Sequence, residues 1–159
     1  MTVTKVALEE LVISLKSDLG HADKHVAELA TWNSTAPSGY EIYAAAMLLH
    51  HLYGAVEAIL ERSLKTFDGK TPEGEGSHKQ LLDQASKGVD GVRVVVLPRD
   101  GAIDELRRFR HLFRKRYDVS LDSIKIHPVI KSAVAAWPRI RSNLATWEAW
   151  VLECAKVAS

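Results

Sequence analysis

The residues best suited to chemistry are arginines and a histidine within one short segment. Between residues 106 and 117 the chain has six basic residues and no acid: Arg107, Arg108, Arg110, Arg114, Lys115 and Arg116. At 100° per residue, five side chains of this segment would share one polar face of a helix: Arg107, Arg110, His111, Arg114 and Tyr117. A guanidinium grips phosphate oxygens through paired hydrogen bonds, and an imidazole transfers protons near neutral pH.

This basic face needs compensation, because like charges three or four residues apart destabilise a helix by about 0.2–0.5 kcal/mol per pair. One source is an acid on a neighbouring helix: Glu57 could pair with Arg110 or Arg114, beside a Gly54 that would allow close helix approach. The other source is a bound anion such as a phosphate. The two are compatible, since one acid can position one arginine while another arginine meets the anion.

Composition limits what the rest of the chain can be. The 159 residues are 47% hydrophobic and carry a formal net charge of +1. These values predict one packed domain over residues 1–159, and they exclude overall electrostatics as the reason for binding nucleic acid. The single Cys154 excludes a disulfide framework and a cysteine-based zinc site, and it fits a reducing compartment.

No segment has the pattern of an export signal or a membrane span. The first residues lead into Glu9 and Glu10 rather than into an apolar run. The longest uncharged stretch, residues 42–56, is shorter than the ~20 apolar residues that a span requires. We therefore expect a soluble, cytoplasmic protein that does not engage a membrane.

The elements that position the basic face are predicted to be helices, because apolar residues recur with helical period through most of the chain. Long helices are predicted over residues 3–32, 42–67, 103–117 and 122–157. The last should be kinked at Pro138, and a short helix should run from an N-cap at Ser77 to Ala85. Residues 89–98 contain the only strand-like run, which has no partner and is therefore expected to be an extended connector.

The predicted fold class is thus an all-α helical bundle of four long helices and one short helix. Large aromatic residues in the last helix are expected to anchor the core or a dimer interface: Trp137, Trp147 and Trp150.

The basic segment also resembles a known motif. Residues 108–117, RFRHLFRKRY, resemble the signature region of the HEPN superfamily, specifically the HepT-like ribonuclease toxins. Their motif is Arg, four to six residues, His, and a Tyr two residues later. Residues 52–59 and 74–82 are similar to upstream blocks of a HepT-like subfamily, so the resemblance extends over roughly residues 40–125. Arg110 then matches the motif Arg and Tyr117 the motif Tyr, while Lys115 stands where the family has His.

The resemblance implies a homodimer whose motif helices meet to form a composite basic cleft. It implies a metal-independent endoribonuclease toxin of a toxin–antitoxin system, which needs no cofactor. The implied partner is a nucleotidyltransferase antitoxin of the MNT class, which in some systems adds AMP to the motif Tyr, here Tyr117. Because of Lys115, the alternative is a catalytically silent HEPN module that binds RNA, a nucleotide or a protein.

Metal-free RNA cleavage needs a base, an acid and a cation that stabilises the phosphorane. Arg110 and Arg114 suit the cationic role, and Arg107 could add a phosphate contact. His111 lies on the same face, so we expect it to transfer protons, alone or with its copy across a dimer. Catalysis by Lys115 or Tyr117 is the remaining possibility, although a lysine at its reference pKa of ~10.4 is a poor base.

A metal-dependent enzyme is a further alternative. His21 and His25 are four residues apart, a spacing that can present two imidazoles to one metal. Three more histidines could complete a site in a bundle: His50, His51 and His78. Solvated helix histidines are commoner than ligands, so we expect no metal centre.

Overall fold

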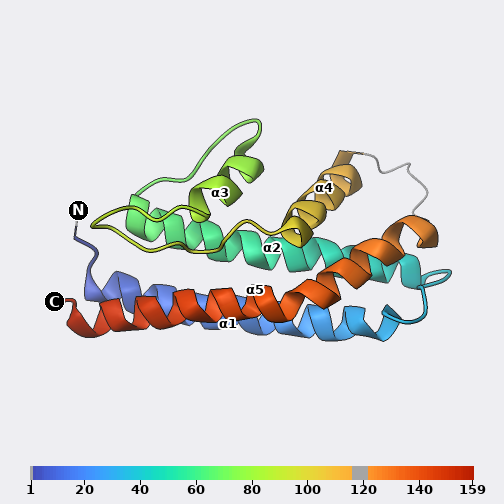
Figure 1. The fold of residues 1–159 in the computed structure, drawn as a ribbon, viewed down its shortest axis with the longest axis horizontal. Helices are drawn as coiled ribbons and strands as arrows, with labels where there is room; N and C mark the ends of the chain where they lie inside the picture. The colour runs from blue at the N-terminus through green and yellow to red at the C-terminus, as the bar shows by residue number, and fades with distance from the viewer. Residues whose placement is uncertain (1, 116–121) are drawn as a thin grey trace.

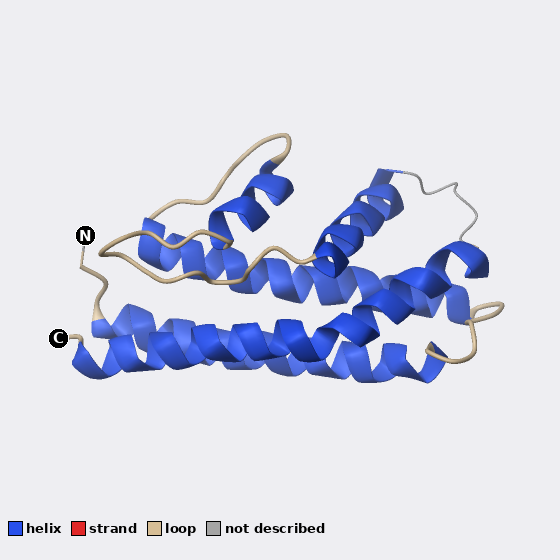
Figure 2. Ribbon diagram, viewed as in Figure 1, coloured by secondary structure: helices blue, strands red, loops and turns tan. Residues whose placement is uncertain are grey.

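The computed structural model describes residues 2–115 and 122–159, with side chains omitted for residues 112–115. The described chain is all helical apart from its connections (Figure 2). The helices are α1 (Lys5–Leu29), α2 (Glu41–Asp68), α3 (Ser77–Ala85), α4 (Gly101–Lys115) and α5 (Ser123–Val157), and a 3-10 turn, η1 (Ala30–Trp32), follows α1. The prediction of an all-α fold with four long helices and one short helix is confirmed.

The helices form two parts that share α2 (Figure 1). α1 packs along both α2 and α5. α3 packs on α2 away from α1, and α4 packs on both α2 and α5. The apolar stripes predicted from helical periodicity line the interior, where Leu15, Leu52 and Leu60 are almost completely buried. α2 therefore lies at the centre of the bundle, and its outer side carries α3 and α4.

The tryptophans of α5 are core residues. Trp147 is almost completely buried, and its Nε1 donates to Ser63 Oγ of α2 at 2.9 Å. The Trp147 ring also packs against Phe67 and Trp150, with ring centroids 5.4 and 5.2 Å apart. Trp137 is buried as well, and its Nε1 donates to Asp23 of α1 at 2.8 Å. The sequence predicted that these residues anchor the core or a dimer interface. Within one chain, Trp137 and Trp147 anchor the core.

Helix ends follow local sequence signals, with one exception. Thr4 caps α1 and Asp122 caps α5 through side-chain oxygens that accept backbone N–H groups. The prediction that Ser77 is the N-cap of α3 was wrong: Gly76, with φ of 76°, holds that position and Ser77 begins the helix. A glycine is suited to this place because the left-handed backbone penalises a Cβ. Pro138 lies inside α5, which changes direction along its length (Figure 1).

The segment after α3 is a connector without a strand, as predicted, but it is not extended throughout, because Val89 and Arg93 pair through their backbones and close a turn. The connector is fixed at two further places. Val96 and Leu97 are buried, and their N–H groups donate to Ala85 O at the end of α3. Arg93 is also buried, and it forms two hydrogen bonds with the carboxylate of Asp68 at 2.7 and 2.9 Å. The connector thus joins the C-terminal end of α2 to the start of α4.

Among the described residues, α2 alone is long and apolar enough by composition to cross a membrane. In its most apolar window 44% of the residues are buried inside the bundle, and α2 contacts every other long helix. A core helix of a soluble protein passes the same test, so the fold fits a soluble protein.

Candidate active site

Three polar side chains from three helices meet on the outer side of α2. His78 Nδ1 of α3 lies 2.5 Å from Glu57 Oε2 of α2. Arg110 Nη2 of α4 lies 4.0 Å from Glu57 Oε1, and Arg110 Nη1 lies 3.4 Å from His78 Nε2. We call Glu57, His78 and Arg110 the central cluster. It contains an acid, an imidazole and a guanidinium within mutual contact.

The sequence places the cluster at a boundary between core and surface. Glu57 follows buried Tyr53 by one helical turn and is 8% exposed, next to core residues of α2. Arg110 follows buried Leu106 by one turn of α4, so its side chain leaves the core edge and is only 17% exposed. The His78 side chain is 41% exposed, which makes it the part of the cluster open to solvent.

Tyr53 forms the floor beneath Arg110. The guanidinium carbon of Arg110 lies 5.8 Å from the centre of the Tyr53 ring, within cation–π range. Burial and the nearby Glu57 carboxylate raise the pKa of Tyr53, with Arg107 and Arg110 acting in the opposite direction. The phenol therefore stays neutral at physiological pH, and its ring packs against the Arg110 guanidinium.

Two arginine donors at this site have no hydrogen-bond partner among the described residues. They are the Nε atoms of Arg107 and Arg110, and both are buried. Arg107 Nε lies 3.6 Å from Asp104, which is an ion-pair contact rather than a hydrogen bond. Buried N–H donors are normally paired, so each of these two needs a partner that the described residues do not supply.

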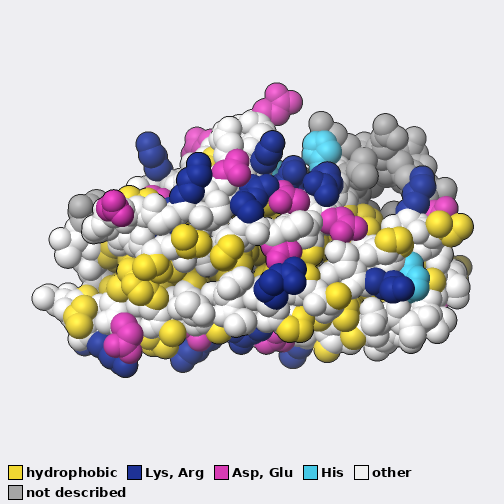
Figure 3. Space-filling view, viewed as in Figure 1, with side chains coloured by type: hydrophobic (Ala, Val, Ile, Leu, Met, Phe, Trp, Pro, Cys, Tyr) yellow, Lys and Arg dark blue, Asp and Glu magenta, His cyan; other side chains and the backbone are white. Residues whose placement is uncertain are grey.

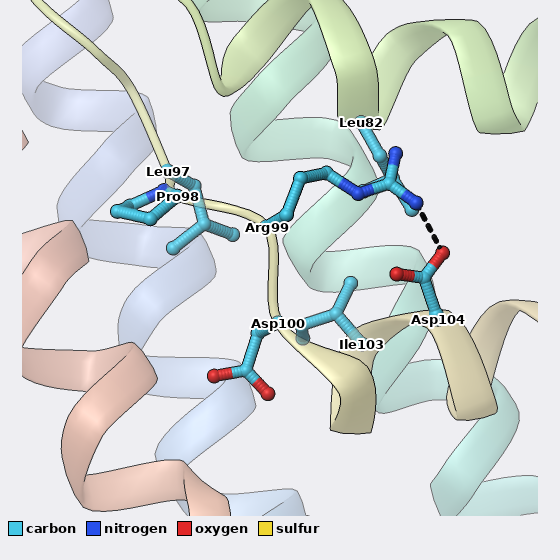
Figure 4. Close-up of a pocket in the computed structure, with 7 residues that line it drawn as sticks. All are labelled: Leu82, Leu97, Pro98, Arg99, Asp100, Ile103 and Asp104. Atoms are coloured by element: carbon cyan, nitrogen blue, oxygen red, sulfur yellow. Dashed lines mark hydrogen bonds and ion pairs between the residues drawn. The ribbon is translucent and has the colours of Figure 1, made fainter.

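Arg99 forms a separate link between α3 and α4, which we call the Arg99 bracket. Arg99 of the connector donates to Asp83 of α3 at 2.7 Å. It also donates to Asp104 of α4 at 2.6 Å (Figure 4). A small pocket surrounds this bracket and includes Leu82 and Ile103, but no residue of the central cluster lines it. Because Asp104 also contacts Arg107, the bracket helps to fix the position of the basic helix.

Charges of both signs gather around the site, as the space-filling view shows over α3 and α4 (Figure 3). Glu61 lies one turn beyond Glu57 on α2. Burial and the Glu57 charge raise the pKa of Glu61, and the charges of His78 and Arg110 oppose this rise. The acids therefore offset part of the arginine charge that the sequence concentrates on one helix.

The sequence suggested a contact between Glu57 and Arg110 as one of two pairings, and the structure contains it. His111 is exposed and has no hydrogen bond or ion pair to a described residue. The side chains of Arg114 and Lys115 and the whole of Tyr117 lie outside what the structure describes. The functional roles assigned to these residues therefore stay predictions.

One expectation about the approach of α4 to α2 was wrong. Gly54 is exposed, and a Cβ added there would meet no atom of the described residues within 4 Å. In the described part of α4, the contacts with α2 are instead made beside Tyr53 and Glu57.

His78 is the site residue that sequence reasoning missed. It was considered only as one of several metal ligands, yet it contacts Glu57 and Arg110. A signal was present, since His78 lies in the segment 74–82 that carries part of the family resemblance. His25 and His51 lie apart from this cluster, with ring centroids 5.7 Å from each other. In the described residues no three His, Cys, Asp or Glu side chains are grouped as metal ligands.

The fold and the site define an α-helical bundle with a basic, carboxylate-supported cluster between α2, α3 and α4. A family model described as HepT-like protein matches residues 44–151, more than half of the chain. The chain belongs to this family, and the HepT-like resemblance inferred from the sequence is confirmed. The matched region includes all three residues of the central cluster. No significant match was found among curated proteins or among solved structures.

Proposed function

We propose that this protein is a metal-independent endoribonuclease toxin of a toxin–antitoxin system. The observation that carries the proposal is Arg110, which contacts Glu57 and His78 and whose Nε donor has no partner among the described residues. Membership of the HepT-like family favours a HEPN-type ribonuclease or a related module. A fixed arginine stabilises a pentavalent phosphorane better than a flexible one, because less entropy is lost on binding.

RNA phosphates are proposed to bind along the basic face of α4. Arg110 grips the reacting phosphate, and Arg107 and Arg114 contact the same or neighbouring phosphates. Arg107 is suited to this because its Nε is buried without a hydrogen-bond partner in the described part of the chain. Phosphate contacts carry little base specificity, so no RNA sequence is assigned. The proposed substrate class is single-stranded or loop RNA.

His111 is proposed to transfer a proton during cleavage, since it follows Arg110 directly and is exposed to solvent. Lys115 and Tyr117 are further candidates on the same helical face, for catalysis or for charge stabilisation. No cofactor is required, because arginines and imidazoles supply the cation and the proton-transfer groups.

The proposed assembly is a cytoplasmic homodimer with a nucleotidyltransferase antitoxin of the MNT class as its partner. In the dimer, the α4 helices of two copies meet to form one cleft. Size-exclusion chromatography with light scattering should give twice the chain mass, and a monomer would contradict this arrangement. Tyr117 is the proposed modification site, so intact mass after co-expression with such a nucleotidyltransferase should increase by one AMP. An unchanged mass would contradict the modification.

A second function is favoured by one observation, the lysine at position 115 where the family motif has His. This function is a catalytically silent HEPN module that binds RNA, a nucleotide or a protein through the same cleft. It keeps the phosphate contacts of Arg110 and lacks the chemical step.

Cleavage of RNA in EDTA separates the two functions. Purified parent protein, Arg110→Ala and Arg108→Ala would be incubated with total cellular RNA. Arg108 is the matched control because it lies on the same helix and is exposed. We expect parent and Arg108→Ala to cleave at similar rates and Arg110→Ala to be at least ~100-fold slower. Salt-dependent RNA binding without cleavage by the parent would instead support the silent module.

A further inference from the structure

His78 occupies a position in which both ring nitrogens face charged groups. Nδ1 lies 2.5 Å from Glu57 Oε2, and Nε2 lies 3.4 Å from Arg110 Nη1. The Glu57 carboxylate is largely buried, whereas the imidazole is 41% exposed. The ring is therefore held from the core side and accessible from the solvent side.

These contacts select one tautomer of His78. An ionised carboxylate only accepts hydrogen bonds, so the proton must be on Nδ1 and Glu57 accepts it. A guanidinium only donates, so Nε2 must carry a lone pair to accept from Arg110. In this tautomer the Nε2 lone pair is directed to the arginine that is proposed to hold a phosphate.

A carboxylate that orients an imidazole beside a reacting group is the general arrangement of a positioned base. The carboxylate fixes the ring and stabilises the cation that forms when Nε2 takes up a proton. Glu57 does this for His78 while it also contacts Arg110. Among the described residues, Glu61 of α2 is a further charged group that interacts with His78.

We infer that His78 is the general base of the RNA cleavage reaction, an inference that rests on the proposed function. Its Nε2 takes the proton of the ribose 2′-hydroxyl, and the 2′-oxygen forms a bond to the adjacent phosphorus. The bond from phosphorus to the 5′-oxygen breaks, and that oxygen receives a proton from His111. The products are a 2′,3′-cyclic phosphate and a 5′-hydroxyl, and the two histidines exchange protons with water before the next turnover.

His78 suits the base better than His111 because of its surroundings. Glu57 orients the His78 ring through Nδ1, while no described residue forms a hydrogen bond or ion pair with His111. His111 is left for the acid step. His78 also contacts Arg110 across a helix interface, so the proton acceptor and the phosphate ligand come from different elements held together by Glu57.

The test compares parent, His78→Ala and His21→Ala in EDTA on a single-stranded RNA. His21 is the matched control because it is an exposed helix histidine on α1. Binding is measured in parallel with a 2′-O-methyl oligonucleotide, which lacks the nucleophilic hydroxyl. We expect His78→Ala to cleave at least ~100-fold more slowly, to bind the oligonucleotide within about threefold of parent, and to regain activity with added imidazole.

Other outcomes overturn the inference in distinguishable ways. If parent and His21→Ala cleave and His78→Ala cleaves equally fast, the inference fails and the proposed function stands. If His78→Ala loses binding together with cleavage, and imidazole restores neither, His78 has only a structural role. If parent itself leaves RNA intact in EDTA, the proposed function fails and the inference fails with it.

Discussion

The imidazole of His78 and the carboxylate of Glu57 are 2.5 Å apart, which joins α3 to α2 at the carboxylate that also faces Arg110. Glu57 therefore contacts two groups with different proposed roles: His78 as a proton acceptor and Arg110 as a phosphate ligand. The charge of Glu57 has opposite effects on these two roles. It stabilises a protonated His78, and it weakens the attraction of Arg110 for an anion.

Glu57→Gln should separate these effects, because it removes the charge and keeps the shape. Binding of a 2′-O-methyl RNA oligonucleotide should tighten about threefold, corresponding to ~0.6 kcal/mol of lost competition. Cleavage should fall at least ~10-fold, because the imidazolium formed at His78 loses its counter-charge. Fluorescence anisotropy measures the binding affinity and a cleavage assay measures the rate. Glu10→Gln, at an exposed position of α1, is the control. Unchanged binding and unchanged cleavage would show that Glu57 supports neither group.

The pair of Arg93 and Asp68 should control stability in acid. Burial acts to raise the pKa of Asp68, but the hydrogen bonds from Arg93 and Gln84 outweigh it and leave that pKa below its usual value. A lowered pKa in the folded state means that the stabilisation is complete above about pH 4, near the unfolded pKa, and is lost as pH falls through the folded pKa.

Arg93→Gln should therefore lower the free energy of unfolding by about 3 kcal/mol at pH 7, since a buried pair loses one partner. The difference from parent should shrink as the pH is lowered from 5 to 2. Urea unfolding at several pH values measures it, with Arg108→Gln as an exposed control. A difference that stays constant over this range would contradict the role of Asp68.

Ser63→Ala tests the contact between α2 and α5 in the core. Ser63 Oγ accepts from Trp147 Nε1 at 2.9 Å, and both residues are almost fully buried. The variant leaves the indole N–H without this acceptor, so we expect a loss of about 1–2 kcal/mol in the free energy of unfolding. Urea unfolding followed by tryptophan fluorescence gives the value, and exposed Ser142→Ala should stay within about 0.5 kcal/mol of parent. Equal stability of the two variants would rule out this contact as a source of stability.

The fold was largely predictable because helical periodicity is a short-range property. Leu15, Leu52 and Leu60 belong to apolar stripes whose spacing alone indicates which side of each helix is buried. The N-cap of α3 was misassigned, because Gly76 competes with Ser77 and only the backbone conformation decides between them. Such a choice depends on the path of the preceding loop rather than on the helix itself.

The candidate site was predictable only in part. Glu57 and Arg110 lie on polar stripes of long helices, so their contact follows from packing two such stripes together. His78 lies on a short helix whose position depends on Arg99 and on the connector after it. Periodicity gives no information on that position, and for the same reason it misplaced the approach of α4 at Gly54.

The most direct test of a phosphate-binding site centred on Arg110 is RNA affinity in EDTA. Fluorescence anisotropy with a labelled single-stranded 2′-O-methyl oligonucleotide would compare parent, Arg110→Gln and Arg108→Gln, which change the net charge equally. We expect Arg110→Gln to weaken binding about 10-fold, as for loss of a charge-assisted hydrogen bond, and Arg108→Gln to weaken it less than threefold. Equal effects of the two substitutions would mean that RNA responds only to total charge, and the site assigned to Arg110 would be wrong.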